Sequence, residues 1–77
     1  MKLKSIAANQ TEIYINDTIV FFSYETPVAF IGKSSSKSEE FYSQTTTKHI
    51  NAFFRRHNIN PKNVKLVTQT EIDNLLK

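Results

Sequence analysis

The segment TEIYINDTIVFFSY, residues 11–24, predicts a β-hairpin around which the rest of the fold is arranged. Its first five residues alternate in side-chain character, and its last seven are mostly β-branched or aromatic. Between these two runs, Asn16 and Asp17 supply turn chemistry. We therefore expect two antiparallel strands joined by a two-residue turn.

The second strand of this hairpin is apolar on both faces. A two-residue turn pairs Ile13 with Val20, and this pairing directs Val20 and Phe22 to one face of the sheet. Ile19 and Phe21 then point to the opposite face, because successive side chains in a strand alternate. The strand is therefore expected to be central, or to have its faces covered by a helix or a second subunit.

Further strands are expected downstream of the hairpin. Pro27 interrupts the pattern because it donates no ladder hydrogen bond, and VAFIG, residues 28–32, predicts the next antiparallel strand. The serine-rich segment KSSSKSEE, residues 33–40, is expected to form a polar, mobile loop at the tip of a hairpin. Residues 40–43 are then expected to form the returning strand.

The segment YSQTTTKHINAFFRR, residues 42–56, predicts the main helix, over residues 46–58. Its apolar side chains recur at helical spacing, whereas most of its cations fall on the other side. The hydroxyl-bearing candidates for the N-cap are Ser43, Thr45 and Thr46. The side expected to face the sheet carries Ile50, Phe53, Phe54 and His57, and the opposite side carries Lys48, Ala52 and Arg55, with His49 and Arg56 at the flank.

The C-terminal part of the chain predicts one more strand and a short helix. Residues 63–67 alternate Val64 and Leu66 with a lysine, which is typical of a strand. TQTE, with Thr68 as cap and Glu71 three residues later, is a capping box that opens a helix over residues 69–77. This helix is expected to pack Ile72, Leu75 and Leu76.

Together these elements predict a single α+β domain over residues 1–77, with a small antiparallel sheet of three to five strands. One amphipathic helix and a short C-terminal helix pack against that sheet. The chain of 77 residues has no cysteine, so neither a disulfide nor a thiolate zinc site is expected. With no signal-peptide pattern and no membrane-length apolar run, we expect a cytoplasmic protein that does not contact a membrane.

Catalysis and metal binding are not expected from the motifs. His49 and His57 are eight residues apart, which is not the i, i+4 spacing of a zinc pair on one helix face. Neither histidine has a carboxylate nearby in sequence, so His57 is expected to be a packed, hydrogen-bonded residue. Gly32 is the only glycine, which excludes a glycine-rich phosphate loop, and no G-x-S-x-G motif is present. We expect a non-catalytic protein without metal or cofactor.

The charge distribution favours a binding surface. Residues 41–70 contain five cations and no acidic residue, although the net charge of the whole chain is only +3. A basic helix face of this kind can follow a phosphate backbone, and hydroxyls at the helix start can donate hydrogen bonds to phosphates. The candidate binding residues are Ser43, Thr45, Thr46, Thr47, Lys48, Arg55, Arg56, Lys62 and Lys65. The double change Arg55→Glu and Arg56→Glu is expected to abolish binding while changing the stability by less than about 1 kcal/mol.

A second hypothesis is binding to a protein. The two-faced apolar strand 19–24 and the nine aromatic residues (six Phe, three Tyr) are typical of a contact with another protein or of a homodimer. The chain would then act stoichiometrically on a host protein. The charge pattern and the apolar strand leave both hypotheses open.

Two segments, FFSYETPVAF (residues 21–30) and YSQTTTKHINAFF (residues 42–54), resemble a group of small phage and mobile-element proteins known only as a domain of unknown function. The shared pattern is Ser-Tyr at the end of an apolar strand, a Val-Ala strand, and Tyr-Ser-x-Thr-Thr with a lysine or histidine and an aromatic position. It falls on Ser23, Tyr24, Val28, Ala29, Tyr42, Ser43, Thr45, Thr46, His49 and Phe53.

The resemblance covers residues 20–54 and implies a phage origin and a bacterial cytoplasm, without implying an activity. By analogy with short phage accessory proteins, it implies binding to nucleic acid or to a bacterial host protein. Inhibition of a host defence protein, in the manner of an anti-CRISPR protein, is one such role.

Overall fold

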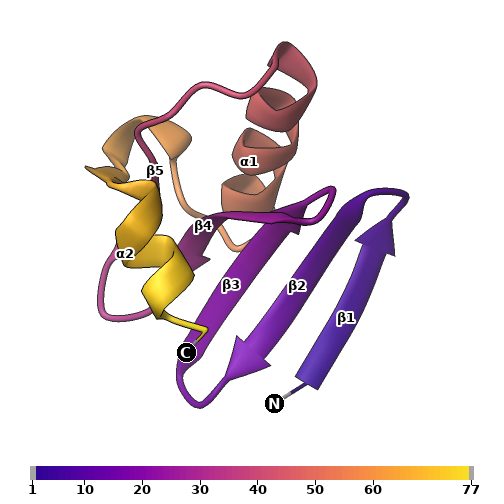
Figure 1. Ribbon diagram of the computed structural model, residues 1–77, viewed down its shortest axis with the longest axis vertical. Helices are drawn as coiled ribbons and strands as arrows, with labels where there is room; N and C mark the ends of the chain where they lie inside the picture. Colours follow the sequence, from indigo (N-terminus) through magenta and orange to yellow (C-terminus); the bar gives the residue numbers. More distant parts are fainter. Residues whose placement is uncertain (1, 77) are drawn as a thin grey trace.

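The computed structural model describes residues 2–76, which form an α+β fold around one six-stranded sheet. The strands lie in the order β1-β2-β3-β4-β5-β6, which is also their order in the chain, and Figure 1 labels the first five of them. The first five strands form an antiparallel meander, and β6 returns parallel to β5. The strands are β1 (Lys2–Ala7), β2 (Gln10–Ile15), β3 (Thr18–Ser23), β4 (Thr26–Ile31), β5 (Ser35–Ser38) and β6 (Lys65–Val67).

The predicted hairpin is present in the predicted register. In β2 and β3, Ile15 pairs with Thr18 and Ile13 pairs with Val20 across a two-residue turn. Asn16 adopts a φ of 52°, a left-handed conformation that asparagine tolerates better than most residues. The sequence prediction of this hairpin is confirmed because the turn and the alternation specify the same register.

The predicted number of strands, three to five, was wrong, because the sheet has six strands in the described residues. Residues 35–38, expected to lie in a loop, form β5 between β4 and β6, whereas residues 40–43 are not a strand. Ser36 and Ser38 are buried, so ladder hydrogen bonds hold this strand where apolar side chains do not. The lysine-rich β1, which the sequence reading did not include, pairs with β2 along the edge of the sheet.

The main helix, α1 (Gln44–Arg56), begins two residues earlier than expected because Ser43 is its N-cap. The Ser43 hydroxyl accepts a hydrogen bond from the backbone N–H of Thr46 at 3.0 Å. Ile50, Phe53 and Phe54 are buried, as the helical spacing predicted. The apolar face of the helix is therefore the one that the sequence indicated.

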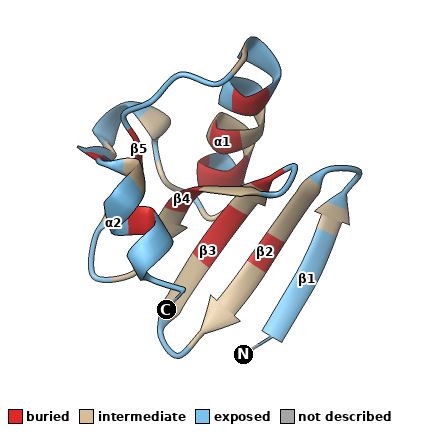
Figure 2. Ribbon diagram, viewed as in Figure 1, coloured by how far each residue is buried: buried red, intermediate tan, exposed pale blue. Residues whose placement is uncertain are grey.

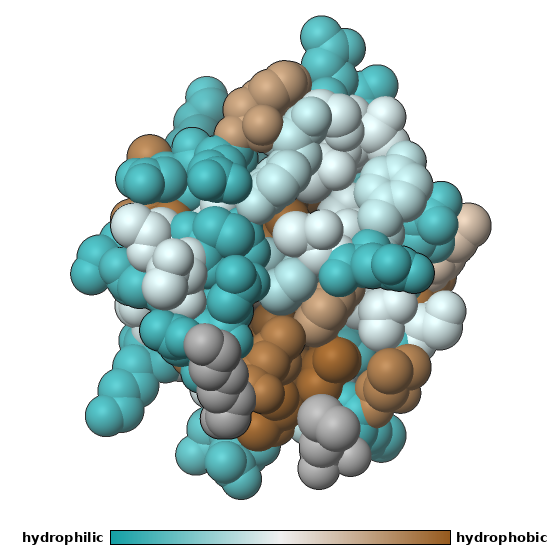
Figure 3. Space-filling model, in the orientation of Figure 1, coloured by the Kyte–Doolittle hydropathy of each residue, from teal (hydrophilic) through white to brown (hydrophobic). Residues whose placement is uncertain are grey.

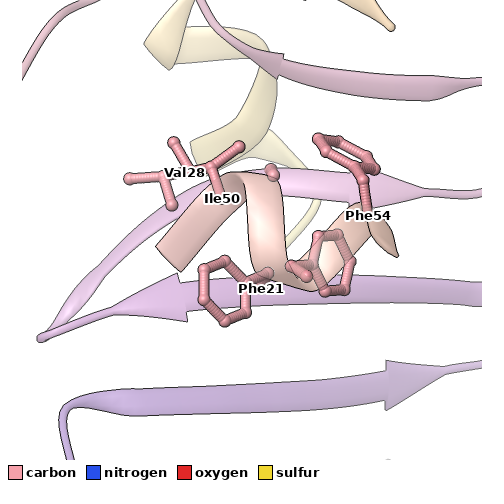
Figure 4. Close-up of a cluster of buried hydrophobic side chains, with 6 residues drawn as sticks. Phe21, Val28, Ile50 and Phe54 are labelled. Carbon is pink, nitrogen blue, oxygen red and sulfur yellow. The ribbon is translucent and has the colours of Figure 1, made fainter. Parts of the chain in front are cut away.

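Helix α1 packs over β3 and β4 to form the core. Phe21 of β3 stacks on Phe53 with ring centroids 4.8 Å apart and planes inclined by 13°. Val28, Ala29, Ile50 and Phe54 complete the buried cluster (Figure 4). Figure 2 shows that buried residues concentrate on the central strands and on the inner side of the helices, whereas β1 is exposed.

The second helix, α2 (Gln69–Asn74), follows the short 3-10 turn η1 (Pro61–Asn63) and β6. Thr68 caps α2 as predicted, accepting from the backbone N–H of Glu71 at 3.3 Å. Ile72 is fully buried, but Leu75 and Leu76 lie beyond the helix and remain exposed.

The two helices lie on opposite sides of the sheet. Phe21 packs on α1, whereas its neighbour Val20 points the other way and lines a hollow together with Leu75, just beyond α2. We call these the α1 side and the α2 side. Within residues 2–76, neither helix is long and apolar enough to span a membrane.

Candidate functional site

Exposed cations of β1 and of α1 lie on the same side of the sheet, although the two elements are far apart in the chain. Lys2 and Lys4 of β1 pair with Tyr14 and Glu12 of β2, and Glu12 pairs in turn with Phe21 beneath α1. The two lysines therefore lie on the same side of the sheet as α1. We define the basic surface as Lys2, Lys4, Lys48, Arg55 and Arg56.

Glu12 is the one carboxylate on α1 or on the α1-side faces of β1, β2 and β3, as far as the structure describes them. It is buried, with 1% of its surface exposed, and it forms an ion pair with Arg56. Five cations thus share this surface with one carboxylate that is already paired. Lys37 is not included because it lies on β5, at the far end of the strand order from β1, and lines a hollow together with Glu39 and Glu40.

The structure separates the predicted cations. Lys48 and Arg55 are exposed on α1 and seven residues apart, which places them on one face about 10 Å apart along the axis. Lys62 is exposed on η1. Lys65 pairs with Ser36, which is opposite Phe30, the partner of Val20, so Lys65 lies on the α2 side. Because Lys65 is close to α1 in sequence, it was grouped with the cations of the helix. The register of β6 on β5 instead directs its side chain to the opposite side of the sheet.

Lys2 and Lys4 were missed as candidates. Their lysine-x-lysine alternation was a usable signal, because in a strand it puts both side chains on one face. That signal becomes informative only once residues 2–7 are known to be a strand next to β2.

The predicted hydroxyl donors are largely engaged within the protein. Thr46 is buried, and its Oγ1 lies 3.1 Å from Oγ of Ser23 and 3.3 Å from Oγ of Ser43. The Thr47 hydroxyl donates to the backbone carbonyl of Ser43 at 3.0 Å. Thr45 is exposed at the start of the helix. Capping and packing thus account for Ser43, Thr46 and Thr47.

The histidines have partners that were not visible in the sequence. His49 Nδ1 lies 2.9 Å from the Ser23 hydroxyl, which is 2% exposed and ties β3 to α1. His57 Nε2 lies 3.2 Å from a Glu12 oxygen, and its ring packs edge-on against Phe53. The expectation that His57 is packed and hydrogen-bonded is therefore confirmed. Among the described residues, no group of three His, Cys, Asp or Glu side chains is arranged so that it could hold a metal ion.

Glu12 is the centre of a polar cluster that joins β2 to the end of α1. The Tyr14 hydroxyl donates to Oε1 of Glu12 at 2.7 Å. The Nη2 and Nε atoms of Arg56 donate to Oε2 at 2.9 and 3.2 Å. Burial by itself raises the pKa of Glu12, but the hydrogen bonds from Tyr14, Arg56 and His57 outweigh it and hold that pKa below its usual value of 4.5.

The same contacts raise the pKa of Tyr14 and make Arg56 a structural residue as well as a surface cation. The hydrogen bond to Glu12 raises the pKa of Tyr14 above its usual value of 10.0, so this phenol is neutral at physiological pH. Arg56 also lies over the Phe21 ring, with its guanidinium carbon 5.8 Å from the centroid. Replacing Arg56 by glutamate would place two carboxylates together at a buried site. The double charge reversal that the sequence suggested as harmless to the fold is therefore expected to be destabilising.

The α2 side carries an exposed apolar surface. Leu3 of β1 pairs with Ile13, which pairs with Val20, so apolar side chains continue across three strands. Leu3 is 66% exposed, and Leu75 lies near Val20 at the end of the chain. Figure 3 shows apolar side chains gathered in the lower half of this face.

The fold and the two surfaces define a small α+β protein with a basic surface on one side of its sheet and an apolar surface on the other. The chain belongs to a family of unknown function, DUF8033, whose family model matches residues 1–74. The resemblance to an uncharacterised domain is confirmed to that extent, and the phage origin stays a prediction. Comparisons with curated proteins and with solved structures found no match.

Proposed function

We propose that this protein is a non-catalytic binding protein whose basic surface contacts nucleic acid. The observation that carries the proposal is that five cations of β1 and α1 lie on the α1 side of the sheet, where the described parts of α1 and of β1 to β3 hold one carboxylate, Glu12, which is already ion-paired with Arg56. Such a surface attracts a phosphate backbone through charge, and release of counterions from the nucleic acid contributes to the affinity. A phage origin and a bacterial cytoplasm are part of this proposal and rest on the resemblance of the Tyr-Ser-x-Thr-Thr element.

Salt dependence tests the proposal directly. The purified protein is titrated against labelled single-stranded DNA, duplex DNA and RNA at several salt concentrations. Binding through phosphates gives a log–log slope of about −0.9 per neutralised phosphate on duplex and about −0.7 on a single strand. Absence of binding to any of these at low salt would refute the proposal.

Two charge-reversal pairs provide a matched comparison. Lys48→Glu with Arg55→Glu reverses the exposed face of α1, whereas Lys62→Glu with Lys65→Glu makes the same change in charge on η1 and the α2 side. The first pair should abolish binding and the second should leave most of it. Equal losses from both pairs would show that overall charge, not the basic surface, governs binding.

A second candidate function is a contact with a protein through the α2-side apolar surface. The exposure of Leu3 beside Ile13 favours it, because exposed apolar patches mark interaction surfaces. The strand 19–24 that the sequence suggested for this contact is an inner strand, and its Val20 and Phe21 are fully buried. The partner would be a bacterial host protein, inhibited stoichiometrically, or a second copy of the chain. Light scattering over a range of concentrations detects the homodimer, and Leu3→Asp should shift it to monomer.

A further inference from the structure

The α1-side face of β1 and β2 forms an uncovered shelf beside the end of α1. Helix α1 packs over β3 and β4, and Figure 1 shows β1 and β2 extending beyond it. A surface hollow of about 280 Å³ lies on these two strands, and the described residues that line it are Lys2, Lys4 and Tyr14. We call this set, with Arg56 of α1, the β1–β2 shelf.

Glu12 holds two members of the shelf in fixed positions. Tyr14 donates its hydroxyl to one oxygen of this buried carboxylate, and Arg56 donates two hydrogen bonds to the other. The phenol ring and the guanidinium are therefore positioned before any ligand arrives, while 32% of the Arg56 side chain stays exposed. Preorganised side chains lose less conformational entropy on binding, which is typical of a recognition site.

The chemistry of the shelf combines one aromatic ring with three cations. Lys2 and Lys4 are exposed, and the described carboxylates form no ion pair with either of them. Aromatic rings that stack on bases, set in a positively charged groove, are the means by which proteins bind single-stranded nucleic acid without reading its sequence. In a duplex the bases are stacked on one another inside the helix, so their faces are not available to Tyr14. Lys48 and Arg55, on the outer face of α1, can contact the phosphates of a duplex or of a single strand.

From this juxtaposition we infer that the β1–β2 shelf binds single-stranded nucleic acid, with a base stacked on Tyr14 and the flanking phosphates held by Lys2, Lys4 and Arg56. The inference rests on the proposed nucleic-acid function and adds the strandedness of the ligand and the residue that contacts the base. It assigns Glu12 as a positioning residue that fixes the Tyr14 ring and the Arg56 guanidinium.

The test compares three probes of similar total charge: an oligothymidylate, an abasic strand of the same length, and a duplex of half that length, because a duplex carries two phosphate backbones. Stacking of one base is expected to make the oligothymidylate bind at least about fivefold more tightly than the abasic strand. Equal affinities for these two strands would overturn the inference, and so would a preference for the duplex. Failure of all three probes to bind would instead refute the proposed function itself.

Tyrosine variants locate the stacking contact. Tyr14→Leu should remove the difference between the oligothymidylate and the abasic strand. Tyr14→Phe keeps the ring but loses the hydrogen bond to Glu12, so it should keep most of the difference. Tyr42→Leu is the matched control, because Tyr42 is an exposed tyrosine whose hydroxyl donates to Gln69, the first residue of α2. Retention of the difference in Tyr14→Leu, or its loss in Tyr42→Leu, would overturn the assignment.

Two further measurements do not depend on the folding of Tyr14→Leu. The protein has three tyrosines and no tryptophan, so quenching of tyrosine emission by the oligothymidylate reports stacking directly. This quenching should disappear in Tyr14→Phe although binding persists, and quenching that is unchanged in that variant would contradict the inference. Lys2→Ala with Lys4→Ala should weaken both single strands equally and reduce the salt slope by about 1.4. An unchanged slope would show that these lysines do not contact phosphates.

Discussion

Replacement of Glu12 by glutamine tests the polar cluster on which the shelf depends. Glutamine has nearly the same shape, and one oxygen can still accept from Tyr14, but the negative charge is lost. Its amide nitrogen would face Arg56 at the position of Oε2, so a donor would meet a donor. The variant therefore removes the ion pair without creating a cavity.

The size of the effect follows from the burial of the three partners. Removing one member of a fully buried ion pair costs about 3–5 kcal/mol. Here Arg56 and His57 keep 32% and 25% of their side chains exposed and regain some hydration, which reduces the cost. We expect Glu12→Gln to lower the free energy of unfolding by about 2–4 kcal/mol at neutral pH. A domain of this size should lose roughly 10–30 °C in Tm.

The pH dependence of stability gives this prediction a second, independent readout. The folded-state pKa of Glu12 lies below 4.5, so its ionised form stabilises the fold above that pH. This contribution is lost as the pH falls from 4.5 through the lowered folded-state pKa. The wild type should therefore lose stability in this window and approach Glu12→Gln, which has no carboxylate to protonate at this position.

Urea unfolding followed by far-ultraviolet circular dichroism measures the free energy of unfolding of wild type and Glu12→Gln. Measurements at neutral pH and below pH 4.5 give both the loss of stability and its dependence on pH. Glu25→Gln is the control, because Glu25 is exposed in the turn between β3 and β4. A difference between wild type and Glu12→Gln smaller than about 0.5 kcal/mol at neutral pH would refute the reasoning. A difference that stays constant in acid would refute it equally.

Two further predictions concern the core and the start of α1. Phe53→Ala should lower the free energy of unfolding by about 3–5 kcal/mol, because it removes a fully buried ring stacked on Phe21. Phe41→Ala, at a position 73% exposed, should change it little. Thermal unfolding of the two variants tests this, and similar Tm values would contradict it. Ser43→Ala removes the N-cap hydrogen bond from Thr46 and should lower the free energy of unfolding by about 1 kcal/mol. Thr45→Ala, at an exposed site, should change it by less than about 0.5 kcal/mol. The midpoints of urea unfolding should differ accordingly, and equal midpoints would refute the capping role of Ser43.

The features that could be predicted from the sequence are local ones. The turn at Asn16 and the alternation on either side of it specified the register of the hairpin. The spacing of Ile50, Phe53 and Phe54 identified the buried face of α1, and Thr68 marked the start of α2. Each of these signals lies within a few residues of the structure that it specifies, so propensity and periodicity were sufficient.

The errors arose where the partner of a segment decides its conformation. Ser35–Ser38 has the composition of a loop, and it becomes a strand because β4 and β6 offer hydrogen-bond partners on both sides. Lys65 was grouped with the helix cations by proximity, but the pairing of β6 with β5 sets its side of the sheet. Propensity carries no information about a partner that is distant in the chain.

The sequence by itself determined the α+β class, the central hairpin, the capped amphipathic helix and the excess of cations in residues 41–70. Only the tertiary structure decided which charges lie together. It brought Lys2 and Lys4 to the side of α1, and it buried Glu12 against Arg56, a residue 44 positions later. The physical reason is that local structure follows from short-range sterics and periodicity, whereas a charged surface depends on contacts between segments that only strand pairing and helix packing bring together.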